Sequence, residues 1–196
     1  MKPSPLLLET IKIEDGEIYN LPYHQKRFEE SRQALFGINK NMDLSAYMTD
    51  RPARGLYRCR IIYNKEIHTI EYFPYIPKKI SSLKIVPADI DYAYKYVCRD
   101  TFNTLLKENS EVDEIIIEKG GLLTDTTISN IAFYDGETWF TPKTPLLKGT
   151  MRAKLIEKHF LKTRDIAKEE LSGYTQVALI NAMIGFKILN HFKIQT

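Results

Sequence analysis

Turn signals between strand-like runs constrain the fold of this chain more than any other feature of its sequence. Asp-Gly pairs at 15–16 and 135–136 lie between apolar runs, as in tight β-hairpins. A Gly-Gly pair at 120–121 and an Asn-Lys pair at 64–65 separate two further pairs of such runs. Hairpins join antiparallel neighbours, and segments with helical spacing are interspersed among them. The sequence therefore predicts an α+β fold with largely antiparallel sheets.

The expected elements divide into a small N-terminal α/β lobe, 1–79, and a larger C-terminal lobe, 80–196. We place the boundary after Pro74 and Pro77, because these prolines end the last strand of the first lobe. The predicted strands cover 6–13, 17–19, 55–63, 66–75, 83–86, 114–118, 122–126, 130–134, 138–141 and 177–181. The predicted helices cover 22–36, 44–48, 96–109 and 149–161, and 182–196 form a tail.

Composition excludes several classes of function. The net charge of +3 is too small to favour nucleic acid or an anionic membrane, and no apolar run approaches the length of a membrane span. Glu9 ends the apolar run that precedes it, so we expect no signal peptide. Cys59 and Cys98 fit neither a disulfide framework nor a metal-ligand spacing. We therefore expect a cytoplasmic protein without a metal site.

Lys95 is the candidate nucleophile. It lies in a run with Tyr94, Tyr96 and Arg99. Aromatic neighbours exclude water and a nearby arginine disfavours the ammonium form, so a lysine in this setting loses its proton more readily. The alternative interpretation is a surface lysine at the start of a helix.

Two further segments have matching chemistry. Asp125 follows an apolar strand, where a surface carboxylate is unexpected; the alternative is an aspartate of a bulge or turn. Gly149 and Thr150 precede a helix, whose first N–H groups attract an anion. The alternative there is an ordinary N-cap. Pyridoxal 5'-phosphate (PLP) needs an amine for its aldehyde, an anion for its ring nitrogen and N–H donors for its phosphate. Together the three segments predict this cofactor.

Weaker candidates complete the set. Residues 181–183 follow an apolar strand and could donate to the same anion, or form an ordinary strand-end turn. Arg27 could pair with the phosphate, although a solvated helix charge is the simpler interpretation. Arg58 and Arg60 are two residues apart on one strand and share a face, so they could bind a substrate carboxylate, with Tyr94 near Lys95. An exposed sheet face is the alternative.

In their order along the chain these segments resemble the class IV aminotransferase family, the fold type IV (D-amino acid aminotransferase-like) PLP enzymes. The resemblance covers most of the sequence. The matching segments are 8–16 (Leu-Glu-Thr-Ile before a glycine turn), 24–31 (His-x-x-Arg), 95–99 (Lys-x-x-x-Arg), 123–131 (Thr-Asp-x-x-x-x-Asn-Ile), 141–152 (Thr-Pro, then Leu-x-Gly-x-x-Arg) and 178–183 (Asn-Ala-Met).

The resemblance implies residue roles. By this resemblance Lys95 is the catalytic Schiff-base lysine, Arg27 binds the cofactor phosphate, and Arg58, Arg60 and Tyr94 are candidates to bind the substrate. The implied cofactor-binding residues are Arg27, Lys95, Asp125, Ser129, Asn130, Gly149, Thr150, Met151, Asn181, Ala182 and Met183.

Within the family the segments at 95–99 and 178–183 are most similar to aminodeoxychorismate lyase, which releases pyruvate and 4-aminobenzoate in folate biosynthesis. A transaminase of branched-chain or D-amino acids is the first alternative, and a non-catalytic relative is the second. The resemblance also implies a homodimer that binds a small amine or amino acid substrate.

Three departures from the family pattern bear on these expectations. The family carboxylate is usually glutamate, and Asp125 is one methylene shorter. The leading strand and Gly-Asp-Gly turn have no counterpart before Leu8, and the tight turn at 64–65 replaces a glycine-rich loop. The sequence therefore predicts a short member of the family.

Overall fold

The computed structural model of the protein describes residues 4–190 and 192–195, and the chain divides into two compact units. Unit 1 comprises Met1–Pro77 and Tyr94–Cys98, and unit 2 comprises Lys78–Ala93 and Arg99–Thr196. The single boundary predicted after residue 79 differs from this division, because Tyr94–Cys98 pairs with a strand of unit 1. No helix of the described residues is long and apolar enough to span a membrane.

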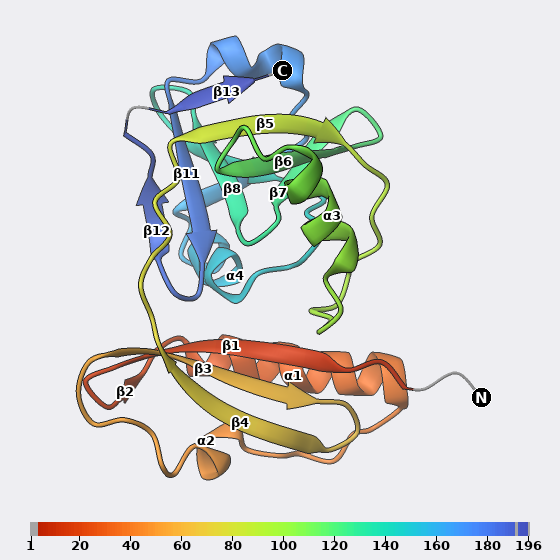
Figure 1. The fold of residues 1–196 in the computed structure, drawn as a ribbon, viewed down its shortest axis with the longest axis vertical. Helices are drawn as coiled ribbons and strands as arrows, with labels where there is room; N and C mark the ends of the chain where they lie inside the picture. The colour runs from red at the N-terminus through yellow and green to blue at the C-terminus, as the bar shows by residue number, and fades with distance from the viewer. Residues whose placement is uncertain (1–3, 191, 196) are drawn as a thin grey trace. The chain divides into compact units, whose positions relative to one another are not determined.

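Unit 1 is a four-stranded antiparallel sheet covered by a long helix. The sheet has the order β2-β1-β3-β4, and Figure 1 shows α1 running along it. The elements are β1 (Leu7–Glu14), β2 (Glu17–Ile18), α1 (Leu21–Phe36), α2 (Leu44–Tyr47), β3 (Leu56–Tyr63) and β4 (Ile67–Pro74). The predicted Asp-Gly turn joins β1 to β2, with positive φ at both Asp15 and Gly16.

The core of unit 1 lies between α1 and one face of the sheet. Phe28 of α1 is fully buried with Ile11 and Ile61, and its ring centroid lies 4.6 Å from that of Tyr63. Alternate residues of β3 face away from this core, and Arg58 lies on that outer face. α1 therefore packs its inner side chains against the sheet, and it carries Arg27, one of the candidate residues.

The segment Tyr94–Cys98 is extended and lies along β1. Tyr96 forms a bridge with Leu7, the Leu8 amide donates to the Lys95 carbonyl at 2.9 Å, and Val97 donates to Leu6 at 2.9 Å. The predicted helix 96–109 is therefore too long, since α3 spans only Asp100–Glu108. Backbone pairing with β1 and packing of Tyr94 and Tyr96 against the unit 1 core outweigh helical spacing here.

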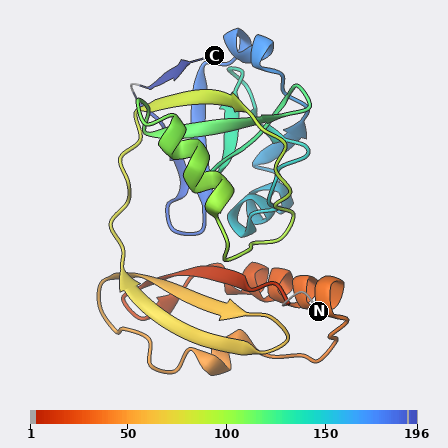
Figure 2. The ribbon, with the colours of Figure 1, turned by 45° about the vertical axis from the view of Figure 1, so that its right-hand side comes forward.

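Unit 2 is built on a nine-stranded sheet, which Figures 1 and 2 show from two directions. Its path runs β10-β9-β8-β7-β6-β5-β13, and β11 pairs with β8 and β12. Only β10/β9, β5/β6 and β13/β5 are parallel among the described pairs, so the predicted α+β class is confirmed. The elements are β5 (Ser82–Pro87), α3, β6 (Glu114–Lys119), β7 (Leu122–Thr126), β8 (Asn130–Tyr134), β9 (Trp139–Pro142), α4 (Thr150–Glu157), β10 (Leu161–Arg164), a 3₁₀ turn (Lys168–Gly173), β11 (Gln176–Asn181), β12 (Gly185–Ile188) and β13 (Lys193–Gln195).

Two predictions for unit 2 were wrong. The helix predicted over 149–161 ends at Glu157, because His159 adopts a left-handed backbone conformation and Leu161 starts β10 beside β9. The predicted tail contains β12 and β13, although residues 191 and 196 lie outside the described part. Apolar spacing alone could not separate a long helix from a short helix followed by a strand.

Both faces of the β8–β11 region are buried. Ile131 and Phe133 point to one apolar cluster, and Ala132 points to the other, which receives Met151 and Leu155 from α4. This packing holds α4 against the sheet, with its N-terminus near the start of β8. The second group of candidate residues lies at that end of unit 2.

Candidate active site

The expected residues fall into two groups, one on each unit. Unit 1 holds Arg27, Arg58, Arg60, Tyr94 and Lys95. Unit 2 holds Asp125, Ser129, Asn130, Gly149, Thr150, Met151, Asn181, Ala182 and Met183.

Arg27 of α1 is held by a buried carboxylate on β1. Its Nε and Nη2 donate to the two carboxylate oxygens of Glu9 at 2.8 and 2.5 Å. His24, one helical turn earlier, lies 2.6 Å from Glu9 through Nδ1. Glu9 and His24 are fully buried, whereas the Arg27 side chain keeps 14% of its surface exposed. We refer to Glu9, His24 and Arg27 as the Glu9 cluster.

Opposing effects set the protonation states of the Glu9 cluster. Burial raises the pKa of Glu9, but the charge of Arg27 and hydrogen bonds from His24 and Arg27 together lower it to about 2. Burial lowers the pKa of His24 below 6.5, more than its bond to Glu9 raises it, and the charges of Arg27 and Lys95 act in the same direction as burial. At neutral pH Glu9 is therefore ionised and His24 neutral, with Nδ1–H as the donor.

Lys95 belongs to the same unit as this cluster. Its backbone is paired with β1 next to Glu9, since the Leu8 amide donates to the Lys95 carbonyl at 2.9 Å. Tyr94 and Tyr96 pack edge to face with ring centroids 6.1 Å apart. Lys95 and Arg27 are therefore both held to β1, the lysine through its backbone and the arginine through Glu9.

The two candidate substrate arginines share the outer face of the unit 1 sheet. The Arg58 guanidinium lies 5.5 Å from the centre of the Phe73 ring, and Arg60 lies 3.8 Å from the Glu71 carboxylate. Arg58 is exposed and Arg60 partly so. Both side chains have partners on β4, as an ordinary exposed sheet face would provide, and both remain candidates for a substrate carboxylate.

Asp125 of β7 is buried in unit 2 and surrounded by donors without charge. Its Oδ1 accepts from the Asn130 amide at 2.7 Å and its Oδ2 from the Leu147 backbone N–H at 2.9 Å. Burial raises the pKa of Asp125 to about 6, against the hydrogen bonds from Leu147 and Asn130 and the more distant charge of Arg152. The carboxylate is thus ionised at neutral pH.

Asn130 connects Asp125 to the turn before α4. Its amide donates both to Asp125 and to the Leu147 carbonyl, at 2.8 Å. A Cβ on Gly149 would lie 2.0 Å from the Asn130 Oδ1, so this position requires glycine. The family pattern of a strand carboxylate, an asparagine and a Leu-x-Gly turn is therefore one contiguous cluster of unit 2.

The N-terminus of α4 is anchored but lacks a capping side chain. Gly149 is its N-cap residue, and no side chain accepts there from the first turn. Thr150 is buried. Arg152 fixes the first turn to the end of β9, donating to the Pro142 carbonyl at 2.8 Å and to the Thr141 hydroxyl at 3.3 Å. A helix N-terminus held in this way suits an anion such as a phosphate.

Asn181 joins the end of β11 to the loop between β7 and β8. Its amide donates to the Ser129 hydroxyl at 2.9 Å, and its Oδ1 accepts from the N–H groups of Met183 and Ile184 at 2.9 and 3.0 Å. The Met183 amide expected for an anion is thus bonded to Asn181. Ala182 lies between them in the turn that leads to β12.

The donor set fits PLP. A carboxylate offers about four acceptor positions, and the donors that face Asp125 come from Asn130, Leu147 and Leu146, which leaves capacity for a ring nitrogen. In unit 2 the uncapped start of α4 is suited to a phosphate. In unit 1 the partly exposed Arg27 is suited to an anion, and Lys95 carries a primary amine.

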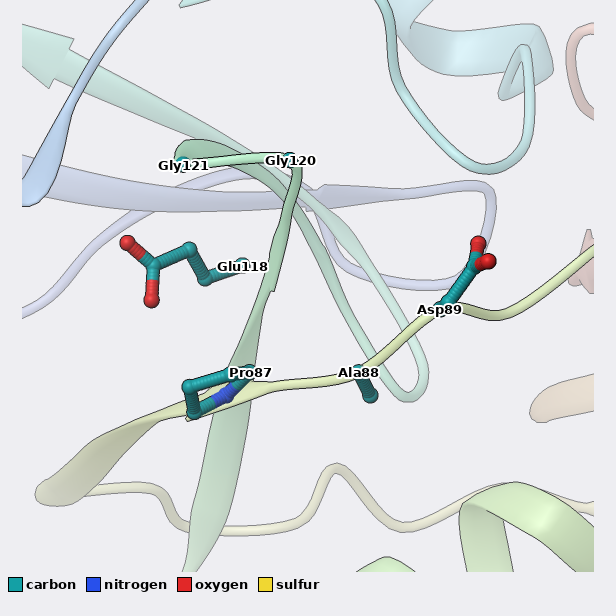
Figure 3. A pocket seen from close by; sticks show the side chains of 6 residues that line it. All are labelled: Pro87, Ala88, Asp89, Glu118, Gly120 and Gly121. Carbon is teal, nitrogen blue, oxygen red and sulfur yellow. The ribbon is translucent and has the colours of Figure 1, made fainter.

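The hollow in Figure 3 is a different feature. It measures about 410 Å³ and is lined by residues at the end of β5 and around the β6–β7 turn. Its carboxylates, Asp89 and Glu118, point in different directions, and each pairs with a lysine, Lys119 at 2.8 Å and Lys168 at 3.3 Å. None of the expected cofactor residues lines it. No group of three His, Cys, Asp or Glu suited to a metal occurs among the described residues.

Glu9 and His24 have a place in the site that sequence reasoning did not assign. The alternation of apolar residues along β1 contained a signal for Glu9. Glu9 alternates with Leu7 and Ile11 on the buried face of β1, where an unpaired carboxylate would be costly. His24 and Arg27, three residues apart on α1, supply the partners that such a carboxylate needs.

Comparison with known proteins places this geometry in a family. Residues 6–188 match the Amino-transferase class IV family. A protein of uncharacterised function from Haemophilus influenzae is 39% identical over 91% of this chain and 98% of its own length. A provisionally named aminodeoxychorismate lyase from Schizosaccharomyces pombe is 27% identical over 86% of this chain and 82% of its own.

A solved structure shares both the fold and the short length. The crystal structure of a provisionally named 4-amino-4-deoxychorismate lyase from Haemophilus somnus 129PT has a TM-score of 0.86 and 39% identity. The match covers 94% of this chain and 100% of that one. The resemblance seen in the sequence and the predicted fold type are confirmed: this chain belongs to the class IV aminotransferase family of PLP-dependent enzymes.

Proposed function

We propose that this protein is a PLP-dependent lyase of the aminodeoxychorismate lyase type, which releases pyruvate and 4-aminobenzoate in folate biosynthesis. The main support is the 39% identity, over nearly the whole sequence, to the Haemophilus somnus protein provisionally named for this activity. The resemblance of the segments around Lys95 and Asn181 to the lyase pattern supports it independently.

In this proposal each group of residues meets one demand of the cofactor. Lys95 binds it covalently, Arg27 and the start of α4 bind its phosphate, and Asp125 accepts from its ring nitrogen. The remaining cofactor-binding residues hold these groups or donate to the phosphate, namely Ser129, Asn130, Gly149, Thr150, Met151, Asn181, Ala182 and Met183.

The chemistry divides between the cofactor and the protein. Bound PLP withdraws electrons from the substrate carbon that bears the amino group. The Lys95 amine removes the proton from that ring carbon as a general base. Cleavage of the bond between the substrate ring and its ether oxygen then expels pyruvate and leaves an aromatic ring. Asp125, ionised at neutral pH, stabilises the protonated ring nitrogen, and Arg58 or Arg60 holds a substrate carboxylate, with Tyr94 beside Lys95.

The test combines a spectrum with product analysis. Protein incubated with PLP should acquire a visible absorption band that borohydride traps on the polypeptide, and Lys95→Ala should lack it. Aminodeoxychorismate should then give equal amounts of pyruvate and 4-aminobenzoate. A trapped band without pyruvate release would refute the lyase assignment. In the unreduced protein, loss of the visible band on addition of a branched-chain or D-amino acid would indicate amine transfer and would instead support a transaminase.

We also propose a cytoplasmic two-fold homodimer that acts on a small amine, as the family resemblance implies. Sedimentation of the purified protein at micromolar concentration should give twice the monomer mass of 22.8 kDa. A strictly monomeric mass would contradict the dimer and leave the cofactor assignment standing.

A further inference from the structure

We infer that Glu9 is a positioning residue: by holding the guanidinium of Arg27, it gives the protein its preference for a phosphorylated aldehyde cofactor over the unphosphorylated aldehyde. This inference rests on the proposed function and deepens it. It assigns the recognition of the phosphate to a carboxylate that itself contacts no cofactor.

The hydrogen bonds between Arg27 and Glu9 fix both the position and the orientation of the guanidinium. Two hydrogen bonds, from Nε and Nη2, join the guanidinium to both oxygens of one carboxylate, which defines the plane as well as the position of the group. Glu9 cannot follow a moving arginine, because its backbone lies in the β1–β3 ladder opposite Ile61. His24 holds one of the same oxygens at 2.6 Å.

Burial is graded across the Glu9 cluster. Glu9 and His24 have no exposed side-chain surface, and only the Arg27 side chain reaches solvent, with 14% exposed. Partial exposure lets the guanidinium keep some of its hydration, which lowers the cost of burying the pair. The same order suits a carboxylate that presents an arginine to an anionic ligand, since the buried partners stay fixed while the guanidinium remains accessible.

The same strand also sets the position of Lys95. The N–H of Leu8, the residue before Glu9, donates to the Lys95 carbonyl, and Leu6 accepts from Val97 two residues further on. β1 therefore holds the arginine through a side chain and the lysine through its backbone. The Lys95 backbone and the Arg27 guanidinium are thus both tied to β1, so a ligand bound covalently to Lys95 would lie in the same unit as the arginine that we propose for its phosphate.

The experiment measures dissociation constants for PLP and for pyridoxal by absorption titration. It uses the wild type, Glu9→Gln, Arg27→Gln and the double variant. We expect the wild type to prefer PLP, and both single variants to lose about 10-fold or more of that preference while binding pyridoxal almost unchanged. The double variant should be no worse than Arg27→Gln, because Glu9 acts only through Arg27.

Arg32→Gln is the matched control. Arg32 is a second buried arginine on α1, bonded to the backbone carbonyls of Lys40 and Lys65 at 2.9 Å. Its replacement should lower thermal stability and leave the ratio of the two dissociation constants unchanged. If Glu9→Gln weakens both ligands by the same factor, or leaves the ratio intact, the inference is overturned.

Other outcomes separate the inference from the proposed function. A wild type that binds neither aldehyde refutes the proposed function, and one that binds both equally refutes the role of Arg27. If Glu9→Gln fails to fold, Glu9→Asp is measured instead, since it keeps the charge and shortens the reach by one methylene. A reduced preference in Glu9→Asp supports the inference, and an unchanged preference overturns it.

Discussion

Two buried carboxylates, one in each unit, have pKa values shifted in opposite directions. Glu9 has a pKa lowered to about 2, and Asp125 has one raised to about 6. Burial raises both pKa values. The difference lies in the partners, because Glu9 faces the cation Arg27 directly, whereas Asp125 faces an amide and backbone N–H groups. Charge in the immediate surroundings, rather than depth, therefore decides the sign of the shift.

The contrast predicts opposite responses of the two units to acid. The stability that Glu9 contributes is present above pH 4.5 and is lost as the pH falls toward 2. His24 acts in the same direction below pH 6.5, since the unfolded protein binds a proton that the buried imidazole does not. Asp125 keeps its proton at a pH where the unfolded protein has lost it, so unit 2 gains stability between about pH 6 and 4.

The largest effect on stability should come from replacing Arg27, the cation that pairs with Glu9 in unit 1. Arg27→Met leaves Glu9 buried without its charge partner, which should cost unit 1 about 3–5 kcal/mol. Hydrogen exchange of the β1 amides reports this loss, while fluorescence of Trp139, the one tryptophan of the sequence, reports unit 2 separately. Adding Glu9→Leu should restore most of the stability. A loss under 1 kcal/mol would show that the cluster relaxes to admit water.

The next effect concerns the pH dependence of unit 2. Burial raises the pKa of Asp125 to about 6, so the unfolding free energy of unit 2 should fall by about 2 kcal/mol as the pH rises from 4 to 7. Asp125→Asn should abolish this fall. Urea unfolding followed by Trp139 fluorescence at each pH provides the measurement, and parallel profiles of the two proteins would contradict the raised pKa.

A smaller effect is expected at the turn beside Asp125. In Gly149→Ala the new methyl group meets the Oδ1 of Asn130. The Asn130 side chain cannot withdraw freely, because its Nδ2–H donates to Asp125. We expect a loss of about 1–3 kcal/mol in unit 2. Gly173→Ala is the control, since a Cβ there meets nothing within 4 Å. Equal stability of the two variants would mean that Asn130 moves without cost.

The smallest effect on stability is expected at an exposed ion pair of α1. Lys26 and Glu30 form an exposed i,i+4 pair at 3.9 Å on the same helix as Arg27. Lys26→Ala should change the unfolding free energy by at most about 0.5 kcal/mol, because solvent screens the pair. Chemical denaturation of Lys26→Ala and Arg27→Met under the same conditions measures both unfolding free energies. A comparable loss in the two variants would contradict the role given to burial.

Local patterns predicted much of the fold and part of the candidate site. Hairpin turns gave the antiparallel pairs, and prolines and glycines gave the ends of α1. Asp125 was expected on a strand and lies on β7. The length of α4, the strands of the tail and the pairing of Tyr94–Cys98 with β1 depend on contacts distant in sequence, which spacing does not contain. Glu9 was missed for the same reason, since its partners lie on another element.

The return of Tyr94–Cys98 to β1 has a consequence for biosynthesis. A polypeptide leaving the ribosome at about 5–20 residues per second makes β1 to β4 and then β5 before it reaches the segment that completes unit 1. Until then the beginning of β1 presents an unpaired strand edge, which is a hazard for aggregation. A gene divided after Pro77 would produce a fragment with that edge exposed and without Lys95, whereas a division after Cys98 would take β5 away from the sheet of unit 2.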